Sequence, residues 1–290
     1  MFGLGLVQSF GYWCTDFLVV QRALAAEDLA ASQRTPLIAA FPKLLYGILA
    51  IFPGLIALSV LGPKIATAAE ANNAVPYAMA YYFPTGMLGF GLTALLAAFM
   101  SGMAGNITAF NTVWTYDIYK PYINRDAPDR HYLNVGRIAT VAGVLLSIAT
   151  AYLALSFTTI INYVQVLHGM FLAPLFGTFL LGMFWRRTTG WGGFTGLVAG
   201  TGYGLIAYLI SLDDGLGASM ARAFFAWIVT LVVTIGVSLV TQPKPDDELR
   251  GLVWGLTEQK EGVEEAWYKK PWVLAVTVLA ITVALNIYFW

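Results

Sequence analysis

Charge is the scarcest property of this sequence. Only 11% of its 290 residues are Asp, Glu, Lys or Arg, against about 25% in soluble domains, whereas 58% are apolar. Soluble packing cannot hide that much apolar surface, and runs of about 20 apolar residues recur along the chain. The net charge is zero and no face is basic, so nucleic-acid binding has no electrostatic basis. We predict an all-α, polytopic membrane protein.

Cysteine and histidine are almost absent. The single cysteine, Cys14, excludes a disulfide framework and a cysteine-based zinc site. The two histidines, His131 and His168, lie far apart in the sequence, which argues against a histidine-rich metal centre. We therefore expect no resident cofactor.

About eight membrane spans are predicted, over residues 3–22, 36–61, 86–118, 134–155, 159–184, 190–211, 219–241 and 271–290. The first, third, fifth and seventh connections carry most of the basic residues. By the positive-inside rule these connections are cytoplasmic, and Trp290 lies on the outer side. Met1 is followed at once by an apolar run without a basic segment, so we expect no cleavable signal peptide and a truncated gene product.

Two connections are long enough to need an interpretation. Residues 62–85 form an outer connection, in which residues 74–83 can lie along the membrane surface as part of a lid or spacer. Residues 242–270 alternate acidic and basic side chains, which is typical of a solvated cytoplasmic linker.

The helix predicted over residues 88–120 is nearly uncharged but carries polar side chains at membrane depth. Hydrocarbon cannot satisfy their hydrogen bonds, so they must face other helices or a wet cavity. Two interpretations stay open: close packing of helices through small and hydroxyl residues, or a solute or ion site. The polar residues are Ser101, Asn106, Thr108, Asn111 and Thr112.

Two charged residues fall inside predicted spans, Asp16 in the first and Lys43 in the second. Each costs roughly 2.5–3.5 kcal/mol at the centre of a membrane helix and should therefore have a partner or face water. Either they form an ion pair that locks two helices together, or they contribute to a solute site.

The fifth span carries three polar groups at steps of three residues, Asn162, Gln165 and His168, which share one stripe of a helix. Neutral amides present donors and acceptors together, which suits a hydroxyl-rich ligand. His168 is interpreted either as a hydrogen bond between helices or as a proton relay.

A half-site for sodium is visible in the helix over residues 88–120. The carbonyl of Ala98 and the hydroxyl of Ser101 lie one turn apart, with Gly102 beside them. The remaining ligands need a second segment, ideally a broken helix with free carbonyls, and no such segment is recognised in the sequence.

At several positions the sequence resembles the sodium/solute symporters, and within them the sodium/glucose cotransporter branch. The resemblance covers nearly the whole chain. It rests on YWCTD at 12–16 with VQR at 20–22 and AA at 25–26, KLL at 43–45 with PG at 53–54, MS at 100–101 with TYDIYK at 115–120, and FLLGMFWRRTTG at 179–190.

The resemblance implies a fold of the leucine-transporter type, with two inverted repeats of five helices. Residues 1–187 would hold the second repeat, core helices six to ten, and residues 188–290 the peripheral helices with the linker at 242–270. The resemblance further implies a multi-pass protein of the cell membrane, in a bacterial inner membrane.

The resemblance also implies site residues. Tyr12, with Trp13 beside it, matches the inner gate that stacks on a sugar; Lys43 and Gln165 match ligands of sugar hydroxyls. Ser9 stands where bacterial sugar carriers have asparagine.

On the sodium side, Ala98 matches a carbonyl donor and Ser101 a hydroxyl donor. Gly102 stands where the family usually has a second hydroxyl residue, which removes one ligand.

The function we expect is sodium-coupled symport of a sugar or similar polar solute by alternating access, with the lipid bilayer as surroundings. The alternatives are a symporter of another solute, such as an inositol, an amino sugar or a carboxylate, and a solute sensor that does not transport. An intramembrane enzyme using Asp16 or His168 is not expected, because no nucleophile and base occur at a suitable spacing.

Overall fold

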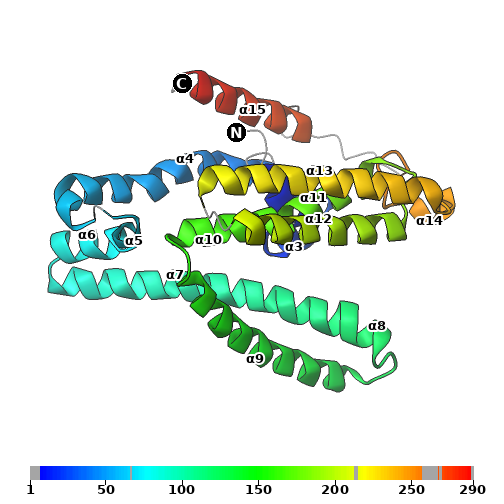
Figure 1. Ribbon diagram of the computed structural model, residues 1–290, viewed down its shortest axis with the longest axis horizontal. Coiled ribbons are helices and arrows are strands. Elements are labelled where there is room, and N and C mark those ends of the chain that lie inside the picture. The colour runs from blue at the N-terminus through cyan, green and yellow to red at the C-terminus, as the bar shows by residue number, and fades with distance from the viewer. Residues whose placement is uncertain (1–6, 66, 212–214, 257–266, 268–269, 289–290) are drawn as a thin grey trace. The chain divides into compact units, whose positions relative to one another are not determined.

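The computed structural model describes residues 7–65, 67–211, 215–256, 267 and 270–288, and within these ranges the secondary structure is helical, without strands (Figure 1). The chain divides into two compact units. Unit 1 comprises Met1–Gly47 and Ile161–Trp290, and unit 2 comprises Ile48–Ile160. The boundary falls within helix α4, Leu29–Leu61, so this helix contributes its first part to unit 1 and its last part to unit 2.

In the part of the chain that the structure describes, six helical segments are long and apolar enough to cross a membrane. They are Leu29–Leu61, Thr85–Tyr122, Asp129–Ala154, Ile160–Phe184, Gly190–Ser211 and Leu216–Val240. These segments match the second to seventh predicted spans, and the shorter apolar helix α15, Pro271–Tyr288, lies at the eighth. The prediction of an all-α polytopic membrane protein is confirmed, although the first predicted span is not one continuous helix.

Proline marks where several helices begin. Helix α7, Thr85–Thr112, follows Pro84, and helix α9, Asp129–Ala154, follows Pro128. Both prolines have extended backbone angles, and a proline there interrupts no helical hydrogen bond. Helix α4 instead continues through three internal prolines, Pro36, Pro42 and Pro53, which membrane helices tolerate better than soluble ones.

The centre of unit 1 is a three-helix group made of α11, Ala173–Phe184, α12, Gly190–Ser211, and α13, Leu216–Val240 (Figure 1). Helix α10, Ile160–Leu167, leads into α11 through the π-helical turn η4, His168–Leu172. A second π-helical turn, η1, Val7–Gly11, packs against α11 and η4. The buried apolar cluster at this junction comprises Val7, Ala173, Phe176 and Ala223.

Helices α12 and α13 pack backbone to backbone along a row of glycines at every fourth position of α12. A Cβ atom at Gly196 would lie 1.9 Å from Thr234 Oγ1, and one at Gly200 would lie 1.9 Å from Thr230 Oγ1. Thr230 and Thr234 are fully buried. Close approach of this kind drives helix association in membranes, where lipid removes the hydrophobic driving force. Gly192 continues the contact with α13 at Ser238, whereas Gly204, at the other end of the row, faces Met170 of η4.

Unit 2 is built around a hairpin of α7 and α9. Helix α7 continues through the π-helical turn η3, Val113–Tyr119, into the short α8, Lys120–Tyr122, before the chain turns back. The side chain of Asn111 fills the space over Gly136, and its Oδ1 accepts a hydrogen bond from Thr115. Asn111 therefore serves helix packing, which is one of the two interpretations left open for the polar residues of this helix.

The outer connection of unit 2 is helical. It contains η2, Gly62–Lys64, α5, Ala68–Ala71, and α6, Ala74–Tyr82. Helix α6 coincides with the segment that we predicted to lie along the membrane surface. The side-chain oxygen of Asn72 accepts a hydrogen bond from Ile160 N. This bond joins the outer connection to the segment that follows α9.

The segment after α13 contains a short helix and two buried apolar side chains. A short helix, α14, Asp246–Leu249, is followed by two glycines at positive φ, Gly251 and Gly255. Leu249 and Val253 are buried, and Trp254 N donates to Met183 O at the end of α11 at 2.8 Å. Two apolar side chains of this segment, Leu249 and Val253, therefore pack against the protein, whereas Leu252 and Trp254 are exposed, and the cytoplasmic linker over 242–270 stays a prediction. Residues 257–266 lie outside the described part.

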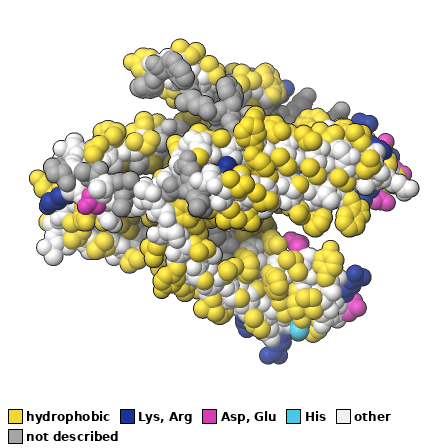
Figure 2. Space-filling view, in the orientation of Figure 1, with side chains coloured by type: hydrophobic (Ala, Val, Ile, Leu, Met, Phe, Trp, Pro, Cys, Tyr) yellow, Lys and Arg dark blue, Asp and Glu magenta, His cyan; other side chains and the backbone are white. Residues whose placement is uncertain are grey.

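The surface of each unit matches a membrane environment. Hydrophobic side chains cover the length of the helices, and charged side chains gather at the helix ends, in unit 1 near α14 (Figure 2). Large apolar side chains along the helices, such as Phe90, Leu145 and Leu209, are exposed. In lipid this exposure carries no hydrophobic cost.

Candidate solute and sodium sites

The first predicted span is interrupted at Asp16, where an extended backbone conformation separates α2, Tyr12–Thr15, from α3, Phe17–Leu24. The Asp16 carboxylate accepts a hydrogen bond from Leu18 N at 2.9 Å, the arrangement of an aspartate that caps the start of a helix. An aspartate before an apolar run is the sequence signal for such a cap. We expected no broken helix in the chain, and this break is the feature that the sequence analysis missed.

The break releases backbone carbonyls. In a continuous helix, Leu18 N and Val19 N would donate to the carbonyls of Cys14 and Thr15. They donate instead to the side chain and the carbonyl of Asp16. Among the described residues, the carbonyls of Cys14 and Thr15 therefore receive no backbone donor. Carbonyls freed at a helix break are the ligands that cations use in transporters with discontinuous helices.

Lys43, on α4, lies against the aromatic rings of Tyr12 and Trp13, which belong to α2 before the break. Its Nζ atom is 4.8 Å from the ring centroid of Tyr12 and 4.9 Å from that of Trp13. The two rings meet edge to face, with centroids 6.4 Å apart. Both distances fall within the range of cation–π interactions, so the charge of Lys43 has a partner inside the span.

The ion pair that we considered between Asp16 and Lys43 is not formed among the described residues. The Asp16 carboxylate caps α3, and the Lys43 ammonium faces aromatic rings. The interpretation of these two charges as a structural lock between helices is therefore wrong. The reason is local, because the Asp16 carboxylate accepts a hydrogen bond from the backbone N–H of Leu18, just after the helix break.

Gly11 sets the position of Tyr12 and Trp13. It is buried, and a Cβ atom there would lie 3.2 Å from the Cβ of Phe176 on α11. Thr15 Oγ1 donates to Gly11 O at 2.7 Å, which holds the turn that precedes the break. This close approach fixes the position of the segment that carries Tyr12 and Trp13 relative to α11.

The other predicted solute ligands are placed as follows. Gln165 is buried in α10, and His168 opens the π-helical turn η4. Ser9 belongs to η1, but its side chain lies outside the described residues. The structure thus brings Tyr12, Trp13 and Lys43 into contact, and Gln165 lies in the same unit on a different helix.

The predicted sodium ligands lie in the middle of α7. Ala98, Ser101 and Gly102 are exposed on this helix, and a Cβ atom at Gly102 would have no protein atom within 4 Å. The carbonyl of Gly102 accepts a hydrogen bond from the side chain of Asn106. Within the described part of unit 2, this face of α7 is open, so further ligands would have to come from other elements.

Comparison with known proteins supplies the family. Residues 1–200 match the model of the sodium:solute symporter family. The sodium/glucose cotransporter of Vibrio parahaemolyticus is 31% identical over 254 residues, which cover 83% of this chain and 46% of that protein. The sodium/glucose cotransporter 1 of Ovis aries is 27% identical over 291 residues, 90% of this chain and 44% of that protein.

The similarity extends to a relative of a different kind. The sodium/myo-inositol cotransporter 2 of Mus musculus is 28% identical over 284 residues, 88% of this chain and 42% of that protein. The chain thus spans less than half the length of these curated relatives. Its family match over residues 1–200 includes the break at Asp16, Lys43 and the α7 helix, and the chain belongs to the sodium:solute symporter family.

Proposed function

We propose that this chain takes part in secondary active transport, the sodium-coupled symport of a polyhydroxylated ring such as a sugar. The observation that carries the proposal is the contact of Lys43 with Tyr12 and Trp13, next to a helix break, in a chain of the sodium:solute symporter family. An aromatic pair supplies apolar faces for the C–H side of a sugar ring, and an ammonium group donates up to three hydrogen bonds to its hydroxyls.

Gln165 would add a neutral amide to this set, which both donates to and accepts from hydroxyl groups. Ala98 and Ser101 would contribute to sodium binding. Binding of sodium would favour the conformation with higher solute affinity, and linkage requires the solute to raise sodium affinity by the same factor.

An inositol is the second candidate solute. A sodium/myo-inositol cotransporter is among the relatives, and an inositol offers the same ring of hydroxyls without a ring oxygen. We place the protein in a cell membrane, and the similarity to a Vibrio protein supports a bacterial inner membrane.

Uptake into sealed vesicles that contain the complete gene product tests this function. Labelled glucose, galactose, myo-inositol and a monocarboxylate are supplied with an inward sodium gradient and with a matched potassium gradient. We expect accumulation of one of the polyols only with sodium. Accumulation of the carboxylate alone, or binding without accumulation, would contradict the proposal.

A further inference from the structure

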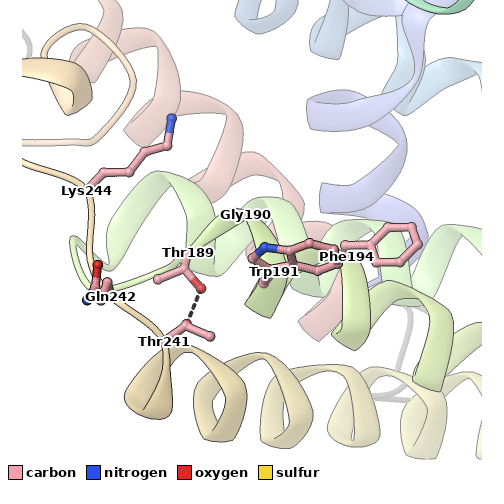
Figure 3. Close-up of a pocket in the computed structure, with 7 residues that line it drawn as sticks. All are labelled: Thr189, Gly190, Trp191, Phe194, Thr241, Gln242 and Lys244. Carbon is pink, nitrogen blue, oxygen red and sulfur yellow. Dashed lines mark hydrogen bonds between the residues drawn. The ribbon is translucent and has the colours of Figure 1, made fainter. Parts of the chain in front are cut away.

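A cavity of about 690 Å³ opens at the N-terminal end of α12 (Figure 3). None of the predicted solute or sodium residues lines it. One end is polar, formed by Thr189, Thr241, Gln242 and Lys244, and the other is aromatic, formed by Trp191 and Phe194 (Figure 3). The indole of Trp191 has its nitrogen toward the polar end and its rings toward Phe194 (Figure 3).

The polar end offers unused backbone donors. Thr189 caps α12, because its Oγ1 accepts a hydrogen bond from Gly192 N at 3.1 Å. The backbone N–H of Thr189 donates to Ser238 Oγ. Among the described residues, the N–H groups of Gly190 and Trp191 have no protein acceptor. A 22-residue helix carries a partial positive charge at this end, which favours an anion.

Two cationic side chains add to this charge. Lys244 lines the cavity and forms an ion pair with Glu248 at 3.2 Å. Both side chains of this pair are exposed, so an anion in the cavity can compete with Glu248 for the Lys244 ammonium group. Arg187 lies two residues before Thr189, outside the lining of the cavity, and among the described residues its guanidinium donates to a neutral acceptor, the carbonyl of Leu239, at 3.0 Å.

The aromatic end suits lipid chains. Trp191 and Phe194 are 69% and 59% exposed, and they lie in the first turn and a half of a membrane-spanning helix. Tryptophan at this depth is typical of the interface between headgroups and acyl chains. The connections on both sides of the cavity are those that the charge pattern predicts to be cytoplasmic, and anionic lipids are concentrated in the cytoplasmic leaflet.

We propose that this cavity binds an anionic phospholipid of the cytoplasmic leaflet. The phosphate lies between Lys244 and the free N–H groups of Gly190 and Trp191, and the acyl chains run over Trp191 and Phe194. The positive charge at the polar end favours an anionic headgroup over a zwitterionic one. The aromatic end favours a lipid over a free anion.

Native mass spectrometry of the complete gene product tests this proposal. Phosphatidylglycerol and phosphatidylcholine with identical acyl chains are titrated against the protein in neutral detergent, and inorganic phosphate in a parallel series. We expect phosphatidylglycerol to bind in preference to phosphatidylcholine. Lys244→Gln should weaken phosphatidylglycerol binding about fivefold, which corresponds to about 1 kcal/mol for one basic residue near an anionic surface.

Two further variants separate the cavity from the general surface charge. Gly190→Leu places an apolar side chain in the cavity, where a Cβ atom has no protein atom within 4 Å, and it should weaken phosphatidylglycerol binding while keeping all basic residues. Arg250→Gln removes an exposed charge outside the cavity, paired with Asp247, and should leave binding unchanged. Equal binding of the two lipids, or equal loss in Lys244→Gln and Arg250→Gln, would overturn the proposal. Binding of inorganic phosphate with no preference between the lipids would assign the cavity to a free anion and overturn it as well.

Discussion

Lys43 covers the ring of Tyr12, with its ammonium nitrogen 4.8 Å from the ring centroid. A solute that stacks on this ring must therefore displace the lysine side chain or share the ring with it. An ammonium group moved off the ring is close to the edge of a stacked solute, where it can donate to hydroxyl groups. In the proposed solute site, the contact would thus satisfy the charge before a solute binds and leave the ammonium group available to a bound solute.

Lys43→Ala in the complete protein should weaken solute binding about tenfold or more, because a hydrogen bond from a charged group contributes roughly 1.5–3 kcal/mol. Sodium binding without solute should change little, because the rings that Lys43 contacts, Tyr12 and Trp13, are not predicted sodium ligands. Isothermal titration of solute and of sodium measures both. Arg250→Ala, a charge removal at an exposed ion pair, is the control. Equal losses of the two affinities would contradict a role confined to the solute.

Ser101→Ala should raise the sodium concentration needed for half-maximal uptake severalfold, because it removes the predicted hydroxyl ligand on α7. Thr93→Ala on the same helix is the matched control, since Thr93 Oγ1 donates to Gly89 O and is not a predicted ligand. Sodium activation curves of uptake measure the effect. Unchanged sodium dependence in Ser101→Ala would place the ion elsewhere.

Gly102→Ser should have the opposite effect and lower the sodium concentration needed. The position has open space for a side chain, and serine would restore the second hydroxyl that the family resemblance implies. The same activation curves apply, with Gly102→Ala as the control for side-chain volume. An identical shift in both variants would show that the hydroxyl is not responsible.

Gly196→Leu should destabilise the α12–α13 pair, because even its Cβ would lie 1.9 Å from Thr234 Oγ1 and 2.9 Å from the carbonyl of Thr230. Overpacking of this kind typically costs about 1–3 kcal/mol. Thermal unfolding in detergent should show a lower midpoint. Gly202→Leu on the same helix has no atom within 4 Å of its Cβ and should leave the midpoint nearly unchanged.

Thr189→Ala should cost about 1 kcal/mol of stability, because it removes the side-chain cap at the start of α12. Thr189→Ser keeps the hydroxyl and should retain most of the stability. Thr195→Ala, whose hydroxyl bonds only within α12, is the control. Denaturant unfolding of the three variants distinguishes a cap from a general loss of hydroxyl groups.

The membrane fold could be predicted because its signal is spread over about 20 residues in each span. The helices over residues 85–122, 190–211 and 216–240 were expected almost to their ends for that reason. The break at Asp16 could not be seen in the same way, because it depends on one extended residue inside an apolar stretch. Hydropathy averages over such a residue, and only the capping signal marks it.

The candidate site was predicted in part. Tyr12, Trp13 and Lys43 were named from the family resemblance, and the structure brings them into contact. Their mutual arrangement could not be deduced, because Asp16 was an equally reasonable partner for Lys43 until its carboxylate was seen to cap α3. The packing of Leu249 and Val253 was missed because the charges around them dominate the local composition.

The glycine row on α12 has a mechanical consequence. Each of Gly192, Gly196 and Gly200 receives one side chain of α13, so a slide of either helix by a single residue would drive a hydroxyl into the opposing backbone. Helices α12 and α13 are therefore expected to move together as a rigid body. In the proposed transport cycle, bending would therefore have to occur elsewhere, for example at the extended residue Asp16 between α2 and α3.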